Sequence, residues 1–390
     1  MIKATFPSWE RCLRRQGGVT LVELMVGMLI GMLAILVISQ VLLVSEGQKR
    51  TTTGGSDAQI NGALSVYAIQ RDVQTAGYGF TSSPAVVGCP ISARFNGVAP
   101  TGFATTLVPV VITTEAARIL ADPAVAVGSG DSVRMLASSK QTYSVPARVV
   151  PPGYVPPPPV GTNFDFAYAM PVTSSLGFAQ GDLALVANSA VQPCWVFQVT
   201  AAPGAQSVPR TDAPNAWNAA ATPAQAYGDG SFLVNLGNLI DNRYEVNNGV
   251  LQLSSFDINT PNARLTRDIQ SDIVSLRAFY GRDTSVPADG IVDVYDTTTP
   301  TTNADWLRVL SVRLVVVARS GQYEKEIVTP ANPTWDVGAT PPTAGAAACG
   351  ASQCITINVG AGVVGDVEPK RYRYKVFETI VPLRNMLWSS

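Results

Sequence analysis

One stretch limits what this chain can fold into more than any other: the hexapeptide Gly18–Glu23 and the apolar sequence that follows it to Val44. Val19–Val44 contains 26 residues, which as a helix would be about 39 Å long. The 22 residues from Leu24 to Ser45 carry no charge. A helix of this length and composition can cross a bilayer with some tilt. We therefore expect 19–44 to be a transmembrane helix.

Glu23 is an acid at the edge of this apolar run. A carboxylate at such a place should cost a few kcal/mol in a membrane, so it is expected to be functional and to need a partner. The natural partner is a free α-amine on Val19. That amine would exist only if the chain were cut after Gly18.

The sequence before that point is a basic leader. Residues 1–18 hold four bases and one acid, namely Lys3, Arg11, Arg14, Arg15 and Glu10. Positive charge ahead of an apolar segment keeps the leading end in the cytoplasm. A standard secretory signal has its apolar core before the cleavage site, whereas here Gly18 precedes the apolar segment. Cleavage would therefore remove the leader and leave the helix on the mature protein.

At these residues the chain resembles the type IV pilins. In that family a prepilin peptidase cuts after a glycine, the new N-terminal residue is methylated, and the fifth mature residue is a glutamate. Gly18, Val19 and Glu23 match those positions, although Val19 replaces the commoner phenylalanine. The resemblance implies cleavage after Gly18, methylation of Val19, and a Glu23 that neutralises the amine of a neighbouring subunit. The other interpretation is an ordinary signal anchor with a chance glutamate.

Composition excludes several functional classes. The chain has 390 residues, a formal net charge of -1 and no histidine. Without histidine there can be no Ser-His-Asp or Cys-His catalysis and no histidine-rich zinc site. Loss of the leader would bring the net charge to about −4, and nucleic-acid binders usually show a basic excess. We therefore expect no enzyme activity, no cofactor and no nucleic-acid partner.

The five cysteines fit an exported protein. Cys12 would be lost with the leader, which leaves Cys89, Cys194, Cys349 and Cys354. An even number in an export context favours two disulfides. Cys349–Cys354 would close a short loop, and this pairing leaves Cys89–Cys194. Other pairings, or free buried thiols, stay open.

A second helical segment is expected over 45–78. Gly27 and Gly31 in the first segment form a G-x-x-x-G that would let helices approach closely in lipid. The stretch Thr51–Gly55 is poor in helix formers, and Ser56 with Gln59 reads as a capping box. Apolar residues then recur at near-helical spacing and should face a core: Ile60, Ala63, Val66, Ile69, Val73 and Ala76. The pattern predicts one long helix, kinked between a membrane half and a packed half.

The rest of the chain divides into two parts. Residues 79–240 are rich in Pro, Gly, Ala and Thr, include the polyproline stretch Val155–Pro159, and are predicted to be a β-rich, loop-rich insertion. Residues 241–390 show alternating strands, of which Arg308–Ala318 is the clearest. Other expected strands are Ser132–Leu136, Asp182–Ala187, Cys194–Val199, Gly249–Phe256, Ile273–Tyr280 and Tyr372–Ile380. The predicted fold class is α+β, a long helix against an antiparallel sheet.

Four segments sharpen the resemblance to the PilW branch of minor pilins. They are Gln70–Tyr78 at the end of the helix, Phe279–Asp283, Val315–Ser320 and the ending Val381–Asn385. The resemblance covers roughly 18–80 and 244–390. It implies that 241–390 is a PilW-like antiparallel β domain.

One acidic loop is a candidate metal site. It contains Asp283, Asp289, Gly290, Asp293 and Asp296. Calcium binds closely spaced carboxylates, but the residues between Asp283 and Asp289 interrupt the usual spacing. A solvated turn with Asp-Gly at its tip is the preferred interpretation.

These observations lead to a hypothesis about function. The resemblance implies a PilW-like minor pilin that primes type IV pilus assembly and sits at or near the pilus tip. It would be single-pass in the inner membrane, with a cytoplasmic N-terminus and a periplasmic C-terminal domain, before entering the pilus. Its partners would be the prepilin peptidase, other minor and major pilins, the assembly platform and a tip adhesin. The alternatives are a minor pseudopilin of a type II secretion system and a membrane-anchored surface-binding protein.

Overall fold

The computed structural model describes residues 18–140, 145–150, 169–188, 191–210, 217, 227–228, 230–260, 263–359 and 368–387. The chain divides into two compact units, Met1–Thr53 and Gly54–Ser390. Leader residues 1–17 and the polyproline stretch Val155–Pro159 lie outside the described residues. The helices are α1 (Leu21–Thr75), α2 (Glu115–Ala121), α3 (Asn303–Leu307) and α4 (Arg384–Leu387), with 3-10 turns η1 (Pro84–Val86) and η2 (Pro369–Arg371).

Helix α1 continues through the poor helix formers at Thr51–Gly55, and Ser56 lies inside the helix rather than capping it. Extending an existing helix adds one hydrogen bond for each residue fixed, so a short run of poor helix formers is tolerated. The Thr52 hydroxyl also donates to the Gln48 carbonyl at 3.0 Å. The predicted long helix is confirmed as one continuous element from Leu21 to Thr75.

The buried face of the second half of α1 differs from the predicted one. Ile60 and Ala63, expected in the core, are exposed, whereas Ile69, Val73 and Ala76 are buried as expected. The buried positions are mostly small, and they recur every three or four residues: Gly54, Ala58, Gly62, Ser65, Ile69, Val73 and Ala76. A Cβ at Gly62 would overlap the ring of Phe377. Small residues face the sheet here because the helix and the sheet approach closely.

A five-stranded antiparallel sheet has the order β13-β12-β11-β4-β3. Its strands are β3 (Val110–Thr113), β4 (Ser132–Ala137), β11 (Ile240–Asn247), β12 (Val250–Phe256) and β13 (Arg264–Ser271). Strands β3 and β4 come from the predicted insertion, yet they complete a sheet begun by the predicted end domain. Residue 240 is therefore not a boundary between compact units, because long-range pairing joins the two regions.

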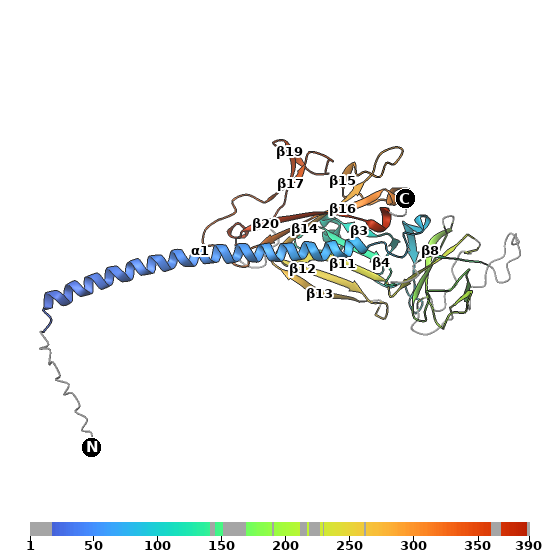
Figure 1. Ribbon diagram of the computed structural model, residues 1–390, viewed down its shortest axis with the longest axis horizontal. Coiled ribbons are helices and arrows are strands. Elements are labelled where there is room, and N and C mark those ends of the chain that lie inside the picture. Colours follow the sequence, from blue (N-terminus) through green and yellow to red (C-terminus); the bar gives the residue numbers. More distant parts are fainter. Residues whose placement is uncertain are drawn as a thin grey trace, which may run out of the picture. The chain divides into compact units, whose positions relative to one another are not determined.

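A four-stranded antiparallel sheet has the order β15-β14-β16-β20. Its strands are β14 (Ile273–Arg282), β15 (Val294–Asp296), β16 (Val309–Arg319) and β20 (Tyr374–Pro382). The first ten residues of β16 are buried, so both faces of this strand are covered. One face contacts α1, and the other contacts a three-stranded sheet, made of β17 (Thr334–Gly338), β18 (Ala347–Cys349) and β19 (Ser352–Thr356). Figure 1 shows the second half of α1 lying across the strands of the five- and four-stranded sheets.

The remaining strands form a six-stranded sheet, β2-β1-β8-β7-β10-β5, and a two-stranded one, β6-β9. The six are β1 (Cys89–Ser92), β2 (Thr106–Leu107), β5 (Ala147–Arg148), β7 (Leu183–Asn188), β8 (Val191–Gln198) and β10 (Phe232–Gly237); the two are β6 (Ala169–Pro171) and β9 (Ser207–Pro209). Together with α1, these sheets confirm the α+β class.

Candidate functional site

The N-terminus of α1 is the first part of the candidate site. The Thr20 hydroxyl oxygen accepts the Glu23 backbone N–H at 3.3 Å. The same hydroxyl donates toward the Glu23 carboxylate at 3.5 Å. Thr20 is thus the cap, and the Glu23 carboxylate lies in the first turn, where the helix dipole favours negative charge. This cap was not predicted above, although the Thr-x-x-Glu spacing is that of a capping box.

Gly18 and Val19 lie in non-helical backbone just before the helix and are exposed. The Gly18–Val19 peptide bond, which is predicted to be cut, is therefore accessible. Val19 is one turn away from Glu23 along the chain. Cleavage, methylation and an amine partner for Glu23 stay predictions.

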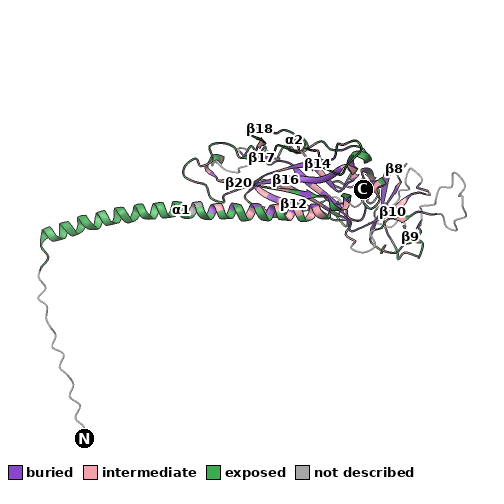
Figure 2. Cartoon of the chain, turned by 45° about the horizontal axis from the view of Figure 1, so that its top comes forward, coloured by how far each residue is buried: buried purple, intermediate pink, exposed green. Residues whose placement is uncertain are grey.

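The apolar half of α1 is exposed on every side. Residues 18–49 are all exposed (Figure 2). The helix has the length and composition needed to cross a membrane. A Cβ at Gly27 or Gly31 would meet nothing within 4 Å among the described residues. These glycines are therefore not required by packing within the chain, which leaves their small size available to another helix.

Two disulfides stabilise the second unit. Cys89 pairs with Cys194, with Cα atoms 5.9 Å apart, and Cys349 pairs with Cys354, with Cα atoms 5.7 Å apart. This is the pairing that the sequence favoured. The first joins β1 to β8 across 105 residues, and the second closes the β18–β19 hairpin. Disulfides of this kind fit an oxidising compartment.

The acidic loop uses its carboxylates for backbone contacts. Asp283 accepts the backbone N–H groups of Ser285, Asp289 and Gly290 at 2.8–2.9 Å. These hydrogen bonds, the one from Gly290 above all, lower the pKa of the Asp283 carboxyl. Asp296 instead pairs with Arg282. Among the described residues, no group of three His, Cys, Asp or Glu side chains could hold a metal ion.

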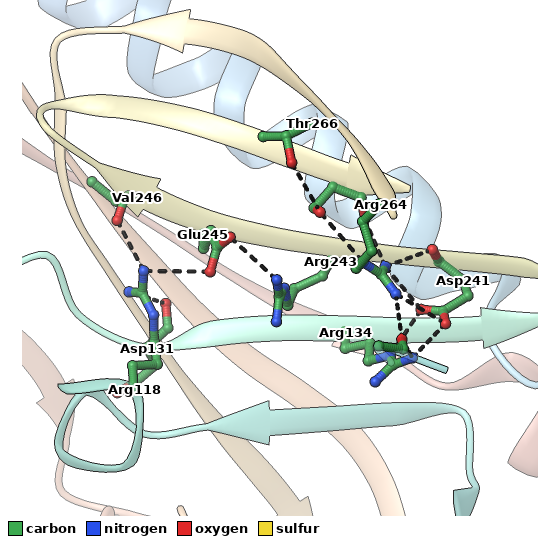
Figure 3. Close-up of polar contacts among 11 residues, drawn as sticks. Arg118, Asp131, Arg134, Asp241, Arg243, Glu245, Val246, Arg264 and Thr266 are labelled. Carbon is green, nitrogen blue, oxygen red and sulfur yellow. Dashed lines mark hydrogen bonds and ion pairs between the residues drawn. The ribbon is translucent and has the colours of Figure 1, made fainter. Parts of the chain in front are cut away.

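Buried charges connect the strands of the five-stranded sheet (Figure 3). The fully buried Asp241 carboxylate on β11 accepts Arg134 Nε from β4 at 2.8 Å and Arg264 Nη2 from β13 at 3.1 Å. Arg264 also donates to the Ser254 carbonyl at 2.7 Å. Burial lowers the pKa of Arg264, and its bonds to Asp241 oppose that shift. Because each group has a partner, this network holds four strands together and is not a reactive site.

A second charged group lies on the same sheet. Arg118 on α2 donates to the Val246 carbonyl at 3.0 Å and to Glu245 at 3.5 Å. Asp131 accepts the backbone N–H groups of Glu115 and Ala278, each at 3.0 Å. Burial raises the pKa of the Asp131 carboxyl. No sequence motif marked either group, because their members are far apart in the chain.

The chain ending secures the other end of α1. Helix α1 stops at Thr75, and Gly77 follows with φ of 83°, a left-handed conformation that glycine adopts at low cost. The Asn385 amide donates to the carbonyls of Thr75 and Ala76 at 3.3 and 3.0 Å. The ending Val381–Asn385 is thus a distant cap for this helix.

Comparison with known families agrees with this geometry. Residues 242–385 match the family model of type IV pilus-assembly protein W (PilW), and residues 13–39 match the prokaryotic N-terminal methylation motif. Residues 242–385 are thus a PilW-type pilin segment, and residues 13–39 are a prepilin-type N-terminal segment. The PilW match ends at Asn385, the residue that caps α1. The resemblance is confirmed over 18–39 and 244–385, and neither match covers residues 40–241.

Among solved structures, a type IV-like pilin from Thermus thermophilus is similar to this chain. It is 14% identical, with 54% of this chain and 86% of that chain covered and a TM-score of 0.22. No curated protein matches the chain.

Proposed function

We propose that this chain is a minor pilin that primes type IV pilus assembly and sits at or near the pilus tip. The PilW match and the methylation motif support a minor pilin of a type IV pilus system. The observation that carries the proposal is an exposed apolar helix with one carboxylate, Glu23, in its first turn. PilW-type proteins are structural pilins, so the proposal includes no catalytic step by this chain.

Processing would create the charge partner that Glu23 needs. The prepilin peptidase would cut after Gly18 and the new amine of Val19 would be methylated. Assembly then withdraws the helix from lipid into a bundle of pilin helices. There Glu23 would exchange its contact with Thr20 for the amine of a neighbouring subunit. A buried ion pair is weak evidence for stability, but it can select one axial register.

The location follows from the same segment. The basic leader would hold the N-terminus in the cytoplasm, and the single apolar helix would anchor the chain in the inner membrane. The second unit would then lie in the periplasm, where its two disulfides can form. Prepilin peptidase and other pilins are the expected partners. We further propose that the chain contacts the assembly platform and a tip adhesin.

A minor pseudopilin of a type II secretion system would share the processing residues. The PilW match over 242–385 favours the pilus. Deleting the gene and assaying both surface pili and protein secretion separates the two, because each hypothesis predicts loss of only one of them.

The decisive experiment substitutes Glu23 and follows processing and assembly separately. Mass spectrometry of the membrane-extracted Glu23→Ala protein should show a methylated Val19 only when the peptidase is present. Incorporation into sheared pili should fall at least about tenfold, because an apolar-embedded amine would lose its partner. Thr20→Ala is the matched control, since it removes the cap hydroxyl and keeps the carboxylate. Normal piliation with Glu23→Ala, or equal loss with Thr20→Ala, would contradict the register role.

A further inference from the structure

A groove runs between α1 and the five-stranded sheet, and the function proposed above does not use it. It has a volume of about 860 Å³. One wall is the exposed flank of α1 from Tyr67 to Thr75, the floor includes Tyr244 and Leu253, and Arg267 on β13 lies on the far side. Helix α4 contributes Arg384 at one end. All of these elements belong to the second unit.

Three arginines border this groove without a carboxylate partner among the described residues. Arg71, Arg267 and Arg384 are exposed and come from three different elements. The other charged groups lining the groove are satisfied. Lys140 pairs with Asp182 at 2.9 Å. The Asp72 carboxylate accepts the Asn242 amide and the Tyr244 hydroxyl at 2.9 and 3.0 Å.

Many of the chain's other arginines are paired. Nine of them form ion pairs with Asp or Glu: Arg118, Arg134, Arg243, Arg264, Arg277, Arg282, Arg313, Arg319 and Arg373. Three unpaired guanidinium groups around one groove leave a local positive potential that favours an anionic ligand.

The arginines are spread out rather than gathered. Strand register places Arg267 beside Leu253, and Leu253 beside Tyr244, whose hydroxyl lies 3.4 Å from the Ala68 carbonyl. Arg384 is next to Asn385, which contacts the Thr75 carbonyl. Seven helical residues separate these two levels, so they are about 10 Å apart along α1. One phosphate or carboxylate cannot reach both, and the ligand must carry several anionic groups.

We propose that this groove binds an extended acidic segment of a partner protein, in which carboxylates alternate with apolar residues. In an extended chain, alternate side chains point to opposite faces and repeat about every 7 Å. One face would place apolar side chains on the floor at Leu253 and Ile269. The other would present two or three carboxylates to the bordering arginines, which suit carboxylates geometrically.

Nucleic acid fits the groove less well. The lining is partly apolar and includes the Asp72 carboxylate. Three phosphate contacts also give little affinity at physiological salt. The proposal does not depend on cleavage after Gly18 or on the role of Glu23.

The test uses the full chain in detergent and a fluorescent pentapeptide, Glu-Val-Glu-Val-Glu, with blocked ends. Binding is followed by anisotropy, with Gln-Val-Gln-Val-Gln and an oligothymidylate as comparison probes. The acidic peptide should bind, and the neutral peptide should bind at least about tenfold more weakly. Arg267→Gln and Arg384→Gln should each weaken binding about fivefold, as expected for exposed charge pairs.

Arg94→Gln is the matched control. Arg94 is exposed, outside the groove and also without a carboxylate partner among the described residues. It should leave the affinity unchanged, and thermal unfolding of all three variants should match the parent chain. The proposal is overturned if the acidic peptide fails to bind at millimolar concentration, or if the neutral peptide binds equally. Equal weakening by Arg94→Gln also overturns it, as does arginine-dependent binding of oligothymidylate tighter than that of the acidic peptide.

Discussion

The two halves of α1 expose large apolar side chains for different reasons. Residues 21–44 are exposed on every side of the helix. From Gly54 onward the helix packs on two sheets, yet Ile60, Leu64 and Tyr67 point outward. The buried face there is made of glycine, alanine and serine before Ile69. Closest approach to the sheet, rather than side-chain size, decides which face of the second half is buried.

The two ends of α1 differ in the same way. Thr20 caps the start through a residue three positions along the chain. Asn385 caps the end from 310 residues away. The start of the first half is therefore stabilised by a local interaction. The second half packs on the β domain, whose residues are far away in the chain.

The largest expected difference in the free energy of unfolding is between variants of two isoleucines, which lie on opposite faces of the second half of α1. Ile69 is 0% exposed and Ile60 is 54% exposed. Ile69→Ala should lower the free energy of unfolding by about 2–5 kcal/mol, because it leaves a cavity under the helix. Ile60→Ala should change it by less than about 0.5 kcal/mol. Denaturant unfolding of the full chain in detergent measures both.

Similar losses for the two isoleucine variants would show that the outward face is buried in solution. An additional loss of pilus incorporation with Ile60→Ala, at unchanged stability, would instead place that face against another subunit.

Two glycines give the next comparison. A side chain at Gly62 would collide with Phe377, whereas one at Gly27 would meet nothing within 4 Å among the described residues. Gly62→Val should therefore cost about 1–3 kcal/mol in stability through overpacking. Gly27→Val should leave unfolding of the second unit unchanged and should reduce incorporation into the pilus. The two readouts are thermal unfolding and immunoblotting of sheared pili.

If Gly62→Val unfolded like the parent chain, the close helix–sheet approach would be wrong. If Gly27→Val assembled normally, the open glycine face would have no packing role.

Local patterns in the sequence predicted what depends on neighbours in the chain. The apolar run, the Thr20–Glu23 segment and the strands β4, β12, β14 and β16 follow from spacing and composition. The buried face of α1 could not be predicted, because Gly62 faces the core only where Phe377 approaches it. The Asp241 network and the Asn385 cap depend on strands and loops far apart in sequence. The groove arginines belong to three separate elements, and each by itself looks like a solvated charge.

The smallest expected effect distinguishes the two caps of α1. Asn385→Ala removes the amide that the Thr75 and Ala76 carbonyls accept, so it should lower the stability of the second unit by about 1–2 kcal/mol. Thr20→Ala should cost about 1 kcal/mol only within the first turn, because nothing else in the described chain packs on that turn. Hydrogen exchange should then show faster exchange near Leu24 with Thr20→Ala and an unchanged thermal midpoint. Asn385→Ala should show a lower midpoint with unchanged exchange near Leu24. A global loss with Thr20→Ala would mean that the first half of α1 is coupled to the domain, and the distinction between a local and a distant cap would fail.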